Sequence, residues 1–74
     1  MSRRSDLKRA IMDSAKEIAE LESKCARSQT ALLQSILNGT RISEEDAQYF
    51  RIYTSLIDVE RENLRKLTEE LKSL

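Results

Sequence analysis

Apolar residues recur every three or four positions along two long segments of the chain, the spacing of a heptad pattern on one face of a helix. In the first segment this row comprises Leu7, Ile11, Ile18, Leu21, Cys25 and Leu32, with Ser14, Ser28 and Ser35 at the intervening places. In the second segment it comprises Phe50, Tyr53, Ile57, Leu64, Leu67, Leu71 and Leu74, interrupted by Glu60. The pattern predicts two amphipathic helices that pack along these rows, which we call the seam.

A single glycine, Gly39, separates the two segments, and the chain has no proline. Gly39 can adopt the left-handed conformation that ends a helix. Ser5 and Ser43 are the expected N-caps, and the acidic residues 44–46 suit the positive end of the second helix. The predicted elements are a helix over about residues 5–38, a turn over 39–43 and a helix over about 44–72, within one domain over 1–74. The expected fold class is therefore all-α, an antiparallel, coiled-coil-like hairpin of two helices.

An antiparallel hairpin allows the two halves of the seam to be aligned. One alignment places Phe50 near Leu32, Tyr53 near Ser28, Ile57 near Cys25, Leu64 near Ile18 and Leu71 near Ile11. Bulky residues of one helix then meet small residues of the other, as a packed interface requires. Glu60 interrupts this seam, and we expect the helices to splay there or Lys24 or Arg61 to compensate its charge.

Further apolar residues lie beside the seam and close to the turn. They are Tyr49, Ile52, Leu56 and Val59 in the second helix and Leu33, Ile36 and Leu37 in the first. Exposed together, they would form a larger apolar patch than a small soluble domain normally shows. These residues and Tyr53 are the predicted partner-binding site. Such a hairpin could lie against a concave helical-repeat protein or cap an aggregation-prone one.

The composition excludes several kinds of chemistry. Thirteen basic residues balance thirteen acidic ones, which argues against a protein that mainly binds phosphate backbones. The chain has no histidine and one cysteine, so an intramolecular disulfide, a Cys/His zinc site and a His-dependent triad are ruled out. No catalytic, cofactor or metal site is predicted, and we expect the protein not to be an enzyme.

The same sequence indicates a cytoplasmic protein. No apolar run approaches the roughly 18 residues that a membrane span needs, and the N-terminus lacks the apolar core of a signal peptide. A single cysteine on the seam fits a reducing compartment, where it would behave as a small hydrophobic residue. We therefore expect a soluble, cytoplasmic protein with no membrane insertion.

Gly39 and the motif Ala47-Gln48-Tyr49-Phe50 lie within the run LQSILNGTRISEEDAQYFRIYTSLI, residues 33–57. This run resembles the small co-chaperones of the type III secretion needle subunit, a family of helical hairpins with a glycine-containing turn before a Gln-Tyr motif. The link between glycine and Gln-Tyr is longer and more acidic here, and the C-terminal tail is longer. The resemblance implies a bacterial cytoplasmic protein that pairs with a tetratricopeptide-like chaperone and keeps the needle subunit monomeric before export.

Two other functions remain open from the sequence. One is a homodimeric structural or adaptor protein, in which two hairpins form a four-helix bundle around the extra apolar residues. The other is a small nucleic-acid-binding bundle that uses the basic residues Arg3, Arg4, Lys8 and Arg9. The zero net charge argues against the second of these.

Overall fold

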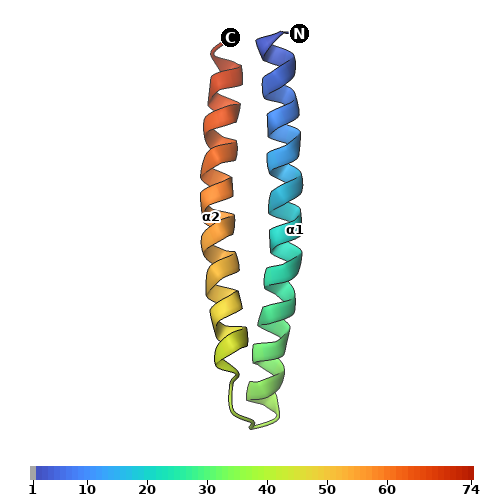
Figure 1. Ribbon diagram of the computed structural model, residues 1–74, viewed down its shortest axis with the longest axis vertical. Helices are drawn as coiled ribbons and strands as arrows, with labels where there is room; N and C mark the ends of the chain where they lie inside the picture. The colour runs from blue at the N-terminus through green and yellow to red at the C-terminus, as the bar shows by residue number, and fades with distance from the viewer. Residues whose placement is uncertain (1) are drawn as a thin grey trace.

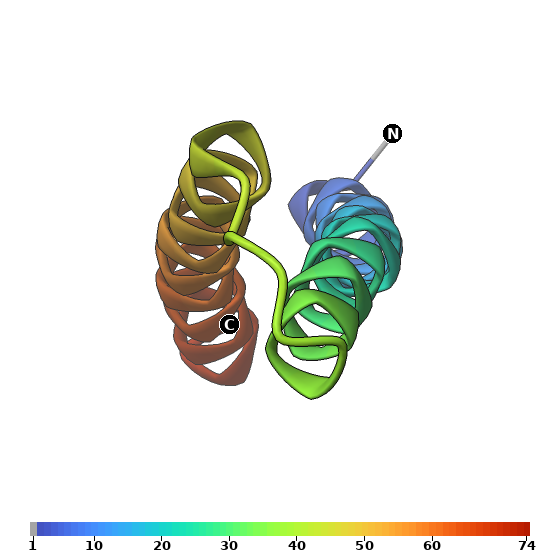
Figure 2. The same ribbon diagram turned by 90° about the horizontal axis from the view of Figure 1, so that it is seen from below.

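The computed structural model describes residues 2–74 and shows an antiparallel hairpin of two long helices, α1 (Arg3–Leu37) and α2 (Glu44–Lys72). The helices lie side by side over their whole length, with both termini at the same end (Figure 1). The hairpin is a rod with extents of 55 × 15 × 14 Å. Seen from the turn, the linking loop crosses from one helix end to the other (Figure 2). The predicted all-α hairpin with its turn at Gly39 is confirmed.

The N-cap of α2 was predicted correctly and that of α1 was not. The Ser43 hydroxyl accepts a hydrogen bond from the Asp46 amide at 3.3 Å. In α1 the cap is Ser2, whose extended backbone (φ −94°, ψ 155°) lets its hydroxyl accept from the Ser5 amide at 3.1 Å. The predicted cap Ser5 is wrong because its own amide is one of the unpaired donors of the first turn, which Ser2 satisfies.

The turn is closed by a Schellman motif around Gly39. The Gly39 amide donates to the Ile36 carbonyl at 3.2 Å, and the Thr40 amide donates to the Ser35 carbonyl at 3.0 Å. This pair of bonds requires a left-handed residue after the helix, and Gly39 has φ 66°. The sequence position of the turn therefore follows from the one residue that adopts this conformation without steric cost.

Replacing Gly39 with alanine is expected to destabilise the hairpin by about 1 kcal/mol because of backbone strain. No atom lies within 4 Å of a β-carbon placed there, so crowding adds nothing. Asparagine tolerates the left-handed region better than alanine does. Urea unfolding should therefore rank wild type above Gly39→Asn and Gly39→Asn above Gly39→Ala, and equal stability of the two variants would contradict this explanation.

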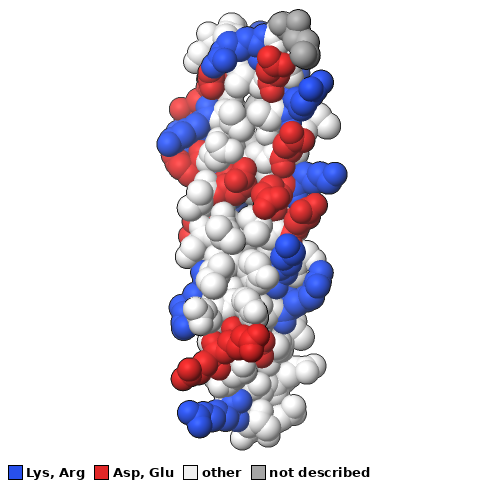
Figure 3. All heavy atoms as spheres, in the orientation of Figure 1, with Lys and Arg blue, Asp and Glu red and all other residues white. Residues whose placement is uncertain are grey.

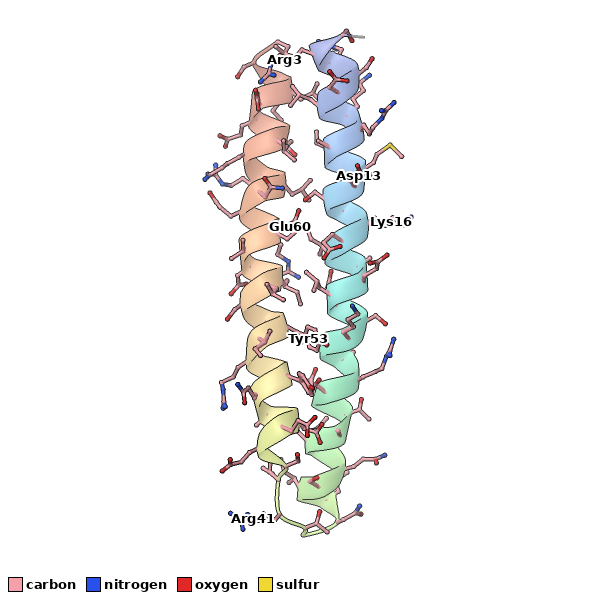
Figure 4. All side chains as sticks on the ribbon, viewed as in Figure 1. Arg3, Asp13, Lys16, Arg41, Tyr53 and Glu60 are labelled. Carbon is pink, nitrogen blue, oxygen red and sulfur yellow. The ribbon has the colours of Figure 1, made fainter. Side chains whose placement is uncertain are left out.

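Contacts across the seam agree with the predicted alignment at some positions and depart from it at others. The Ser14 hydroxyl donates to the Glu60 carboxylate at 2.7 Å, and Arg3 pairs with Glu70. Figure 4 shows Glu60 level with Lys16 of α1. The predicted alignment set Leu64 beside Ile18 and so Glu60 beside residue 22, which lies about 12 Å along the helix from Ser14. Cys25 and Ile57, however, line one groove and Arg61 pairs with Glu22 at 3.5 Å, as the predicted alignment has them. The Ser14 and Arg3 contacts are the ones that depart from it.

Burial along the seam is uneven, and the best-buried part of α1 lies away from the turn. Leu7, Ser14, Ile18 and Leu21 are buried, and Ile57 is the one residue of α2 as well covered. From Cys25 to the turn, the seam residues of α1 are only half-buried, as are Phe50 and Tyr53 opposite them. The core of the turn-proximal half is thus incomplete, and toward the termini Leu64, Leu67 and Leu71 of α2 are only half-buried as well.

Candidate protein-docking surface

Four of the predicted partner-binding residues form a continuous row on α2, which we call the α2 stripe: Tyr49, Ile52, Leu56 and Val59. Their spacing of three and four residues places them on one side of the helix. All four are exposed, and Val59 retains 67% of its accessible surface. Nothing in the hairpin covers this side of α2, so the stripe is available to another molecule.

The predicted residues of α1 lie on the opposite side of the hairpin. Thr54 and Ile57 of α2 line an open groove with Glu22, Cys25, Ala26 and Gln29 of α1. Leu33 and Ile36 continue the row of Ala26 and Gln29 along α1 toward the turn. Thr54 is two residues from both Ile52 and Leu56, a rotation of about 200° around α2. The groove and the α2 stripe therefore occupy different faces.

Leu33, Ile36 and Leu37, which we call the α1 stripe, are more exposed than most of the α2 stripe. Leu37 retains 83% and Ile36 60% of its accessible surface. The prediction of one contiguous patch is thus replaced by two apolar stripes on opposite faces of the turn-proximal half. Tyr53, the last predicted residue, is half-buried on the seam between them.

Two hollows follow each other along the α2 stripe. Gln48, Arg51, Ile52, Ser55 and Leu56 line a hollow of about 370 Å³. Asp58, Val59, Glu62, Asn63 and Lys66 line the next, of about 450 Å³. Hollows bounded by residues three and four apart are the holes that receive side chains of a second helix. The sequence pattern identified the apolar rims of these hollows, but not the polar residues that complete them.

The two tyrosines stack at the start of the α2 stripe. The ring centroids of Tyr49 and Tyr53 lie 6.2 Å apart with the planes inclined by 23°. The nearby Glu45 carboxylate raises the pKa of the Tyr49 hydroxyl, chiefly through its charge. The stacked ring of Tyr49 lies exposed beside the seam, a position typical of aromatic interface anchors.

Charged side chains are distributed unevenly over the hairpin. No charged residue lies between Arg27 and Arg41. On the face shown in Figure 3, Lys, Arg, Asp and Glu are more closely spaced toward the end that carries the termini. There Arg65 pairs with Glu62 at 2.6 Å and with Glu69 at 2.9 Å. These contacts raise the pKa of Arg65 and lower that of Glu62. The terminal half is thus adapted to solvent and the turn-proximal half less so.

Glu60 is accommodated by polar partners rather than by a cation. Its carboxylate accepts hydrogen bonds from the buried Ser14 hydroxyl at 2.7 Å and from the Asn63 amide at 3.1 Å. The predicted role of Arg61 is wrong because Arg61 pairs with Glu22 at 3.5 Å, and no ion pair joins Lys24 to Glu60 among the described residues. The Ser14 bond, and then the Asn63 bond, lowers the pKa of Glu60.

These hydrogen bonds predict a dependence of stability on pH. A carboxylate whose pKa is lower in the folded chain than in the unfolded chain stabilises the fold at pH values above its ordinary pKa, which is 4.5 for Glu60. That contribution is lost as the pH falls below this value, toward the folded pKa. Urea unfolding measured between about pH 3 and 6 should show a shallower pH dependence for Ser14→Ala than for wild type. Identical slopes would contradict the role given to Ser14.

Several other residues that the sequence singles out lie outside the two stripes. Leu74, predicted on the seam, lies beyond the end of α2 and is exposed. Arg3 of the basic cluster pairs with Glu70. Cys25 is a free, half-buried thiol on the groove. Within residues 2–74 no group of three or more cysteine, aspartate or glutamate side chains could hold a metal ion, and neither helix is long and apolar enough to cross a membrane.

Comparison of the chain with protein-family models, with curated proteins and with solved structures finds no match. The two apolar stripes and the incomplete core between them are therefore the features of the hairpin that bear on its function.

Proposed function

We propose that this chain is a small, non-catalytic protein-interaction module that acts by docking its turn-proximal half on other proteins. The observation that carries the proposal is the incomplete core between Cys25 and Phe50, flanked on both faces by exposed apolar residues. Full burial of one such side chain favours association by about 1.5 to 3 kcal/mol before the costs of ordering are subtracted. Several of them together can hold a stable complex.

We extend the proposal to a co-chaperone role. In this role the hairpin binds and stabilises a helical-repeat chaperone and helps to keep a type III secretion needle subunit unpolymerised before export. The support is the resemblance of residues 33–57 to the small co-chaperones of that subunit, together with the hairpin fold that this resemblance implies. The corresponding location is the bacterial cytoplasm, and the function would serve bacterial virulence.

Affinity purification from the native cell tests this role. A tagged wild-type chain should recover one helical-repeat protein at one-to-one stoichiometry, and the needle subunit with it. Leu37→Asp should lose that protein, because a carboxylate would enter an apolar contact without a partner. Met12→Asp is the matched control, since Met12 is 71% exposed in the terminal half. Recovery of the chain alone, or equal recovery by Leu37→Asp and wild type, would refute the role.

The second candidate is a homodimeric structural or adaptor protein built as a four-helix bundle. It is favoured by the α2 stripe, which is an unbroken helical row with hollows of the kind that a second helix fills. A defined dimer of the purified chain that binds no other protein would support this candidate over the co-chaperone role.

A further inference from the structure

We propose that the α2 stripe is a self-association site, on which a second copy of this chain docks its own α2 in antiparallel orientation. The inference rests on the proposed function of the turn-proximal half as a docking surface. It assigns one occupant to one of the two faces. The α1 stripe, on the opposite face, is left free for a different protein.

The first reason is the shape of the row in which the α2 stripe lies. The row runs Glu45, Tyr49, Ile52, Leu56, Val59, Asn63, Lys66, with steps of three and four throughout. This is a second heptad seam on α2, rotated away from the one that packs on α1. The holes beside Ile52 and beside Val59 are bounded by residues three and four apart, the arrangement that receives a side chain from a facing helix.

The second reason is the charge at the two ends of this row. Glu45 precedes the apolar residues and Lys66 follows them, and both are exposed. Neither takes part in an ion pair among the described residues. A second α2 running in the opposite direction brings the acidic end of one row toward the basic end of the other, whereas a parallel copy opposes like charges. The row is therefore complementary to itself in the antiparallel orientation only.

A twofold axis between Ile52 and Leu56 packs the apolar residues of the two rows together and also brings Glu45 toward Lys66 of the second copy. Ile52 of one copy then faces Leu56 of the second copy, a side chain of the same size, and the large Tyr49 faces the smaller Val59. Glu45 comes within about one helical turn of Lys66 of the second copy, close enough for two long side chains to pair. Such an interface is isologous, because the same row serves on both copies.

Sedimentation velocity of the purified full chain over a concentration series tests the inference. The mass of wild type should rise from 8.6 kDa toward twice that value. Glu45→Lys or Lys66→Glu alone should weaken the dimer by about tenfold, because each change breaks two symmetry-related pairs. The double variant, which exchanges the two charges, should recover the wild-type affinity. Lys16→Glu reverses a charge that points away from α2 and should change nothing (Figure 4).

Three results would overturn the inference. A chain that stays at 8.6 kDa at every concentration has no self-association site. A dimer that survives Ile52→Asp uses another surface. A dimer insensitive to both single charge reversals, or not restored by the double variant, is not antiparallel in this register. Each of these results leaves the binding of another protein on the α1 stripe to be judged separately by Leu37→Asp, so failure of the dimer is distinguishable from failure of the proposed function.

Discussion

Replacing Leu56 or Ile52 with aspartate is expected to abolish association through the α2 stripe while leaving the helical content nearly unchanged. These side chains keep 46% and 43% of their accessible surface in the hairpin, so the change is tolerated there. In an interface, the new carboxylate would be removed from water without a partner, which costs several kcal/mol. Circular dichroism should match that of wild type, while light scattering or co-purification should show the complex lost.

Met12→Asp provides the control for this pair of variants. It makes the same kind of substitution at an exposed apolar residue of the terminal half. We expect it to retain both helicity and association. If the Leu56 and Ile52 variants assemble as well as Met12→Asp does, the α2 stripe is not a docking site.

Truncation of the buried part of the seam is expected to unfold the isolated chain. Leu21 and Ile57 are each 7% exposed. Removing such a side chain typically costs 2 to 5 kcal/mol, roughly the whole stability that a core of this size supplies. Leu21→Ala and Ile57→Ala should therefore lose most of their ellipticity at 222 nm at room temperature.

A bound partner should restore part of the fold of these variants, because binding to the folded state alone shifts the equilibrium toward it. Leu37→Ala is the control, since Leu37 is 83% exposed and its truncation should leave the melting curve almost unchanged. A Leu21→Ala chain that melts as wild type does would show that the core is elsewhere.

The elements could be predicted from the sequence because their ends are set locally. Gly39 is the residue that adopts positive φ, and Ser43 stands before an acidic first turn, so the loop boundaries follow from neighbouring residues. The start of α1 was misassigned because Ser2 and Ser5 are both competent caps. The choice between them depends on where the backbone becomes extended, which the residue types alone do not decide.

The register could not be obtained from the apolar pattern. Seam residues repeat every three or four positions, so alignments that differ by one helical turn bury similar side chains. The contact that distinguishes them is polar: Ser14 donates to Glu60 across the hairpin. A carboxylate on a seam suggests a cation as its partner, whereas no sequence pattern near Glu60 indicates a buried hydroxyl from the other helix.

The exposure of apolar residues beside the seam could be predicted from the sequence, but their arrangement on the hairpin could not. Proximity to the turn suggested one patch, whereas the rotation around each helix decides which face a side chain takes. Leu33 and Ile36 lie on the side of α1 that borders the groove, whereas the α2 stripe lies on the other side of the hairpin. In an antiparallel hairpin the equivalent flanks of the two seams share a face, as Cys25 and Ile57 do in the groove. The two stripes lie on different faces because they occupy non-equivalent flanks of their seams.

Hydrogen exchange followed by mass spectrometry tests most directly whether the turn-proximal half docks on other proteins. The chain would be compared dilute, at high concentration, and in the complex recovered from its native cell. We expect association to increase protection over residues 49–59, over 31–37 or over both, with little change over 3–21. Unchanged protection under all three conditions, or a gain confined to the terminal half, would contradict the assignment of this half as the docking surface.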